Sequence, residues 1–159
     1  MPRPPTSASA QDISSVASGL AAALPALNRA LDRRLAQDFP HAEPSKNQLA
    51  LLRLVGERAG ITVREAAEAL LIKPNNVSAL VSQLVAEGLL ERRQDATDKR
   101  IAHLRLTAEA LRRVAAIEQL LQGYVTEALL TLSDGDVAAI GSVLSALATL
   151  PGRINPATD

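Results

Sequence analysis

Residues 73–107, KPNNVSALVSQLVAEGLLERRQDATDKRIAHLRLT, decide the fold of this chain. The first half places apolar residues at steps of three and four, which predicts an amphipathic helix that stops at Gly88. Pro74 suits the first position of that helix, because a residue there needs no backbone N–H donor. The second half has LLERR, a polar turn (QDATDK) and the alternating segment RIAHLRL, which together predict a β-hairpin. The inward side of the helix is formed by Val77, Leu80, Val81 and Leu84.

Two shorter helices are expected before this stretch. Ser45 with Gln48, and Thr62 with Glu65, have the spacing of a capping box, in which two side chains satisfy free N–H groups at a helix start. Gly60 suits the left-handed conformation that follows many helices. The order helix, helix, helix, strand, turn, strand predicts a winged helix-turn-helix, and a fold that is mainly α with a small β-hairpin wing.

Long amphipathic helices are expected on both sides of this region, from about Ile13 to Leu35, from Leu111 to Leu129 and from Val137 to Leu150. Pro25 should kink or locally break the first helix, and Phe39-Pro40 should end it. Three such apolar faces favour a homodimer interface over a bundle folded within one chain, because a small central domain cannot cover them. The expected divisions are a disordered tail (1–10), an N-terminal dimerisation helix (11–40), a winged helix-turn-helix (45–107), C-terminal dimerisation helices (108–150) and a tail (151–159).

The composition excludes several functions. The chain has no Cys, which removes disulfide scaffolds and thiolate metal sites. Phe39 and Tyr124 are its only aromatic residues, too few for a surface that stacks single-stranded bases. No G-x-S-x-G, phosphate-loop or H-E-x-x-H segment occurs, so we expect neither an enzyme nor a cofactor. No run reaches roughly 18 consecutive apolar residues, and the uncharged stretch 13–28 contains serines, so we expect a cytoplasmic protein without a membrane span or signal peptide.

The net charge of zero conceals an uneven distribution. Residues 46–107 carry ten Lys and Arg against seven Asp and Glu, whereas residues 108–159 carry three against six. A basic middle favours a polyanionic partner, although a solvated surface of mixed charge explains the same counts.

The outward side of the helix after Pro74 carries amides and hydroxyls but no charge. Amides can pair with adenine in the major groove, and small side chains allow close approach. A solvated helix face is the alternative interpretation. Lys73 occupies the N-cap position, where a helix prefers Ser, Asp or Asn. A nearby phosphate would compensate for its charge at the positive end of the helix, and an ordinary surface lysine is the alternative. The candidate DNA-binding residues here are Lys73, Asn75, Asn76, Ser78, Ala79, Ser82 and Gln83.

The turn of the expected hairpin is also cationic. Lys99 and Arg100 have the charge needed in a narrow, electronegative minor groove. An Asp beside such residues can hold an arginine by a charge-assisted hydrogen bond. The alternative is a charged turn that protects an edge strand from pairing.

The stretch from Gln48 to Thr107 resembles the winged helix-turn-helix of the MarR family of bacterial transcriptional regulators. The short helix after ITV, the helix ending in GLLERR, the D-x-x-D-[KR]-R turn and the closing LRLT carry the resemblance. The flanking helices fit the family's interlocked homodimer, from about Gln11 to Leu150. The resemblance implies base contacts at Asn75, Asn76, Ala79 or Gln83, wing contacts at Lys99 and Arg100, and an orienting role for Asp98. Many members carry Arg where Ala79 stands.

We therefore predict a homodimeric regulator, a repressor, that binds an inverted repeat in double-stranded DNA. The alternative is a winged-helix module for protein–protein assembly, which would more plausibly show apolar anchors on its third helix. The resemblance also implies a small anionic or aromatic effector between the dimer helices and the winged domain. Its candidate ligand residues are Arg29, Arg33, His41 and Tyr124, each of which also fits an ordinary surface or core position.

Overall fold

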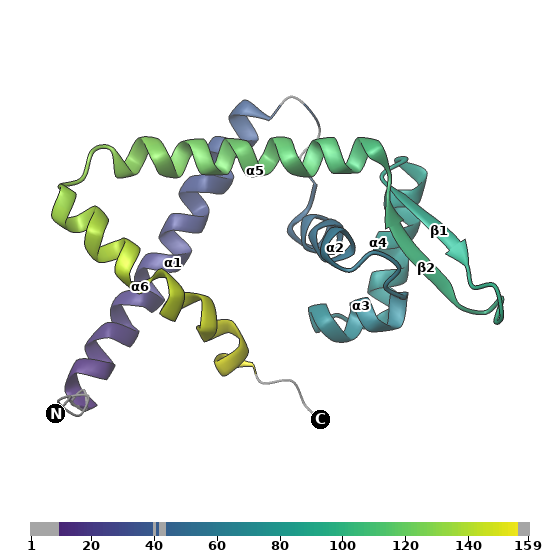
Figure 1. Cartoon of the computed structure of the whole chain (residues 1–159), viewed down its shortest axis with the longest axis horizontal. Helices are drawn as coiled ribbons and strands as arrows, with labels where there is room; N and C mark the ends of the chain where they lie inside the picture. Colours follow the sequence, from purple (N-terminus) through teal and green to yellow (C-terminus); the bar gives the residue numbers. More distant parts are fainter. Residues whose placement is uncertain (1–9, 40, 42–43, 156–159) are drawn as a thin grey trace, which may run out of the picture. The chain divides into compact units, whose positions relative to one another are not determined.

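The computed structural model describes residues 10–39, 41 and 44–155. Within these residues the chain is mainly helical with one antiparallel two-stranded hairpin, which confirms the predicted fold class. The chain divides between Gln119 and Leu120 into two compact units. The elements are α1 (Ala10–Asp38), α2 (Lys46–Glu57), α3 (Val63–Leu70), α4 (Pro74–Ala86), β1 (Leu90–Gln94), β2 (Ala102–Leu106), α5 (Ala108–Leu129) and α6 (Asp134–Ile154) (Figure 1).

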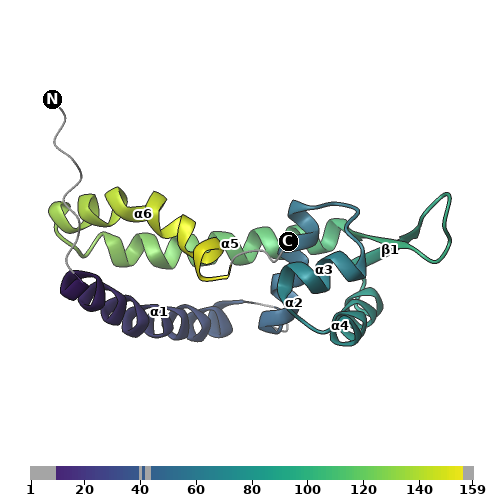
Figure 2. The same ribbon diagram turned by 90° about the horizontal axis from the view of Figure 1, so that it is seen from below.

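The apolar core of the first unit is shared by α2, α3, α4, the hairpin and the start of α5. Leu51, Val77, Val81, Leu84 and Leu104 are fully buried. Burial of each such side chain stabilises the fold by roughly 1.5–3 kcal/mol. Two views show the three short helices gathered beside the hairpin, whose connecting loop extends away from them (Figures 1 and 2).

Both predicted capping boxes are confirmed. The Ser45 hydroxyl accepts from the Gln48 N–H at 3.2 Å, and the Gln48 side chain accepts from the Ser45 N–H at 2.8 Å. Thr62 and Glu65 repeat the arrangement at 3.2 and 2.8 Å. Gly60 has a φ of 88°, as its predicted left-handed role requires. These contacts fix where α2 and α3 begin and how the chain turns between them.

Main-chain hydrogen bonds attach the hairpin to the segment that precedes α3. The strands pair from Leu90 opposite Leu106 to Gln94 opposite Ala102. Gly60 N–H donates to the Leu104 carbonyl, and Leu104 N–H donates to the Ile61 carbonyl, both at 2.9 Å. The hairpin is therefore anchored to the helix-turn-helix through backbone groups.

Helix α1 runs unbroken through Pro25, so the prediction of a local break there is wrong. A proline removes one backbone donor, and the helical hydrogen bonds on both sides of it keep the helix continuous. Near the end of α1, Leu35 and the following Phe39 are buried, and Lys46 Nζ lies 2.7 Å from the Asp32 carboxylate. The apolar residues nearer its start, Ile13, Val16, Leu24 and Leu27, are each more than half exposed.

Helix α6 in the second unit begins after Ser133, whose hydroxyl accepts from the Asp136 N–H at 3.2 Å. It continues to Ile154, so residues 151–154, expected to belong to a tail, are helical despite Pro151. Residues 1–9 and 156–159 of the predicted tails lie outside the described residues, as does Pro40. The apolar residues Val137, Ile140, Val143 and Leu144 are 38–56% exposed.

Helix α6 is also long and apolar enough to cross a membrane, by length and composition alone. Its mean hydropathy over an 18-residue window is 1.5, and none of that window is buried. Counting consecutive apolar residues does not reveal this property, because Gly, Ser and Thr interrupt the run without adding charge. A helix face that a protein partner covers has the same character.

Candidate nucleic-acid interface

Helix α4 presents the residues predicted to contact DNA. Its inward face is buried in the core at Val77, Val81 and Leu84, and Leu80 is half-buried. Lys73 occupies the N-cap position, and its side chain forms no capping hydrogen bond. The remaining predicted residues are all exposed: Asn75, Asn76, Ser78, Ala79, Ser82 and Gln83.

One of these residues is held by a contact from the hairpin. The Ser82 hydroxyl donates to the Ser78 carbonyl at 2.9 Å and accepts from Arg92 Nη2 at 3.1 Å. This places the Arg92 guanidinium, which sequence reasoning did not single out, beside the exposed face of α4. The alternation along β1 puts Arg92 and Arg93 on opposite faces, but the sequence does not show which face meets α4.

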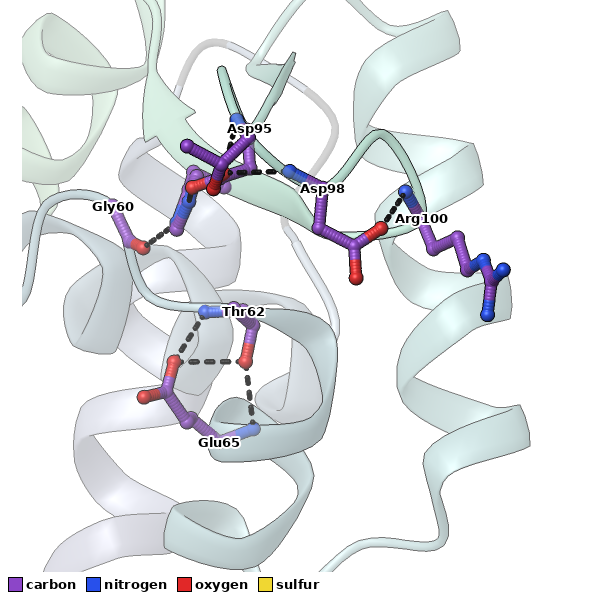
Figure 3. A network of polar contacts seen from close by, with 8 residues as sticks. Gly60, Thr62, Glu65, Asp95, Asp98 and Arg100 are labelled. Atoms are coloured by element: carbon purple, nitrogen blue, oxygen red, sulfur yellow. Dashed lines mark hydrogen bonds and ion pairs between the residues drawn. The ribbon is translucent and has the colours of Figure 1, made fainter.

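The loop between the strands is organised by Asp95, another residue that sequence reasoning missed. Its Oδ1 accepts from Thr97 N–H at 2.8 Å, Thr97 hydroxyl at 2.6 Å and Asp98 N–H at 3.1 Å (Figure 3). The hydrogen bonds from the Thr97 hydroxyl and then from His103 hold the pKa of the Asp95 carboxyl well below its usual range. The carboxylate is therefore ionised throughout the physiological pH range and remains an acceptor.

Asp98 acts on the backbone of the wing arginine. Its Oδ1 accepts from the Arg100 N–H at 2.9 Å, and the Arg100 side chain extends away from it (Figure 3). Any orientation of Arg100 by Asp98 therefore runs through the main chain, and not through the charge-assisted side-chain hydrogen bond that the residue types suggest. Asp95 and Asp98 together give the loop its shape.

Several cations of α4 and the hairpin are not neutralised within the described part of the chain. There, Lys73, Lys99, Arg100 and Arg92 form no ion pair, and the Arg92 guanidinium donates a hydrogen bond to the Ser82 hydroxyl. By contrast, Arg112 on α5 lies 2.8 Å from Glu109. The start of α4 and the wing thus carry positive charge that is available to an external anion.

The four candidate ligand residues belong to both units of the chain. Arg29 and Arg33 are exposed on α1, His41 is exposed and meets Phe39 edge-on at 5.5 Å, and Tyr124 is buried in the second unit. None of them lines the cavity of about 300 Å³ found in the first unit. That cavity is bounded by apolar residues, among them Phe39, Leu52, Leu89, Val114 and Ile117, and by Gln48, Glu87 and Arg113.

The profile of the MarR family matches residues 44–101. The YusO protein from Bacillus subtilis is similar in structure, with a TM-score of 0.69 at 20% identity over 89% of this chain and 99% of that one. A MarR family protein from Bacillus stearothermophilus gives 0.75 at 17% identity over 90% and 97%. Streptococcus pneumoniae FabT, solved in complex with DNA, gives 0.70 at 16% over 91% and 100%. A search of curated protein sequences finds no match. The family profile and the shared fold confirm the resemblance seen in the sequence.

Proposed function

We propose that this chain, whose residues 44–101 match the profile of the MarR family, is a homodimeric, sequence-specific regulator of transcription that binds double-stranded DNA. The observation that carries this proposal is the exposed face of α4. It bears amides and hydroxyls without any charge and lies beside cations that have no ion-pair partner among the described residues. A protein-binding surface would more commonly present aromatic or aliphatic anchors there.

The chemistry of this face matches the major groove. Asn76 and Gln83, seven residues apart on one side of α4, can each pair with adenine through two hydrogen bonds, and the Ala79 methyl can contact a thymine methyl. Lys73 and Arg92 would neutralise phosphates, while Lys99 and Arg100 would enter the minor groove. The DNA complex of FabT, which has the same fold, supports this assignment.

The homodimer is supported by the exposed apolar faces of α1 and α6, which a second copy would cover. A two-fold dimer presents two copies of α4, so we expect an inverted repeat with half-sites about one helical turn apart. Sedimentation of the wild-type protein should give the mass of two chains. Ile140→Glu on α6 should give one chain, whereas Leu71→Asn, at an exposed leucine of the winged helix, should not change the mass.

We further propose that the protein represses transcription, that a small anionic or aromatic effector releases it from DNA, and that it acts in the cytoplasm. The cavity of about 300 Å³ offers apolar walls and the Arg113 guanidinium, whose Nε donates to Glu109 at 2.7 Å. That volume is at the lower end of ligand pockets, roughly 300–1,000 Å³. Addition of 4-hydroxybenzoate as a probe should weaken the wild-type complex with DNA more than the Arg113→Ala complex.

Selection of bound sequences from random duplex DNA tests the central proposal. We expect an enriched inverted repeat whose affinity falls steeply with salt, as counterion release requires. Arg100→Ala should weaken binding, and Arg112→Ala, which removes an ion-paired arginine of α5, should not. If a dimer of the correct mass enriches no sequence, the protein–protein module becomes the better assignment.

A further inference from the structure

His103 on β2 bridges the wing loop and the helix-turn-helix. Its Nδ1 lies 2.6 Å from the Gly60 carbonyl oxygen, and its Nε2 lies 2.9 Å from Asp95 Oδ2. Figure 3 labels both partners of this ring, Gly60 and Asp95. Gly60 belongs to the segment before α3, and Asp95 is the residue on which the wing loop is organised. The imidazole therefore joins two parts of the winged helix.

Both partners of the ring are acceptors. A backbone carbonyl has no proton to donate, and the Asp95 carboxylate already accepts three hydrogen bonds from Thr97 and Asp98. Each ring nitrogen must therefore carry a proton for both contacts to form, and only the imidazolium cation has two. A neutral ring can keep one of the contacts but must turn a lone pair toward the other acceptor.

Charged side chains of both signs lie near the His103 ring. Asp95 and, from α3, Glu65 favour the imidazolium, and the hydrogen bonds to Asp95 and then Gly60 raise the pKa of His103 above its ordinary value. Arg93 and Arg105 line the same hollow and oppose the cation, and Arg58 lies near Glu65. The ring thus loses its proton at a higher pH than a free histidine does.

We propose that His103 is a positioning residue that, as an imidazolium, holds the wing loop on the helix-turn-helix, so that DNA binding weakens as the ring is deprotonated. The predicted effect on DNA binding rests on the proposed function, whereas the link between His103 and the wing loop does not. Below the raised pKa of His103 both contacts are present; as the pH rises through it, the link between Gly60 and Asp95 is lost. The loop that carries Lys99 and Arg100 then becomes less restrained.

The first part of the test uses the free protein and needs no variant. NMR titration from about pH 5 to about pH 9 should give His103 a midpoint above the ordinary histidine pKa of about 6.5. The backbone amides of Thr97 and Asp98 should shift with the same midpoint, because their acceptor is the carboxylate that the ring contacts. His41→Gln, which removes the other histidine of the chain, identifies the signal and should leave these shifts unchanged.

The second part measures DNA binding at constant ionic strength. The Kd of the wild-type protein for its selected site should rise roughly three- to tenfold between about pH 6 and about pH 8.5. His103→Gln should abolish most of this dependence, and His41→Gln should retain it. A ring that only added charge near DNA would change Kd without moving the wing amides of the free protein.

The outcomes separate the two proposals. Wing amides that do not follow the His103 titration, or a His103→Gln protein that keeps the wild-type pH dependence, would overturn the positioning role. A free protein whose wing amides do follow His103, but which binds no duplex at any pH, would overturn the proposed function and leave the link between His103 and the wing established.

Discussion

Arg92 Nη2 donates a hydrogen bond to Ser82 Oγ at 3.1 Å, which ties strand β1 to the exposed face of α4. Arg92→Ala should therefore remove a phosphate-binding cation and release Ser82. We expect DNA affinity to fall roughly three- to tenfold, with a salt dependence smaller by about one ion, as measured by fluorescence anisotropy over a range of salt. Arg92→Lys should restore the salt dependence, and unchanged affinity in Arg92→Ala would show that this arginine does not face DNA.

Asn76 and Gln83 should determine sequence preference. Alanine at either position removes an amide from the exposed face of α4 and leaves its charge unchanged. The ratio of affinities for selected and scrambled sites should fall about 5- to 100-fold, and the salt dependence should stay the same. Competition titrations with the two duplexes measure this ratio. A uniform loss of affinity for both duplexes would argue against base contacts.

Leu84 should be a principal stabilising residue of the winged helix. Its side chain is fully buried in the core, so Leu84→Ala should lower the free energy of unfolding by about 2–5 kcal/mol. Urea denaturation followed by circular dichroism gives the value. Val85→Ala is the matched control on the same helix, because Val85 is 39% exposed, and it should change stability far less.

Gly88 ends α4 with a φ of 71°, in the left-handed region. A Cβ at this position would meet no atom within 4 Å, so Gly88→Ala should cost stability through the backbone alone, about 1 kcal/mol. Gly123→Ala, in the interior of α5 and equally open, should stabilise the protein by about 0.5–1 kcal/mol. Thermal unfolding of both variants tests the opposite signs.

The capping box of α3 should make stability depend on pH. The hydrogen bonds from the Thr62 backbone and hydroxyl lower the pKa of Glu65 from 4.5. Because this pKa is lower in the folded state, the stabilisation is present above the ordinary carboxyl range and is lost as the pH falls through the lowered value. The wild-type protein should exceed Glu65→Gln in stability near about pH 6, and the difference should shrink on acidification below about pH 4.5.

A Thr62→Ala variant tests the other half of the same box. Loss of the hydroxyl leaves the Glu65 N–H without its acceptor, and we expect a cost of about 1 kcal/mol in urea denaturation. Ser14→Ala, at an exposed serine in α1, is the control and should have little effect.

Local signals in the sequence predicted most of the winged helix. Ser45, Thr62 and Pro74 act on residues within one turn of themselves, so the helix starts they predict depend little on the rest of the fold. Pro25 shows the limit of such signals. A proline disfavours a helix, but its cost is small beside the many hydrogen bonds of a 29-residue helix, and α1 continues through it.

The contacts across the hairpin could not be assigned from local patterns. From the local sequence pattern, Asp95 is expected in a polar turn and His103 on the outward side of a strand. Their contact depends on the register, in which His103 opposes Arg93 and Asp95 follows two residues later on the same side. Diagonal neighbours of this kind are within reach of long side chains, so a correct register would have indicated the pair. To predict the contact between Arg92 and Ser82, one would also have to know how β1 packs against α4.

The absence of any charged residue between Asn75 and Ala86 separates two properties that many nucleic-acid-binding helices combine. Lys73, Arg92 and the wing would provide the affinity for the DNA backbone. The amides, hydroxyls and methyl group of α4 would provide the sequence specificity. Exchange of the small polar side chains should therefore redirect the protein to a different operator, while its sequence-independent affinity for duplex DNA stays constant. Helix α4 is for this reason a suitable element for the design of regulators with new operators.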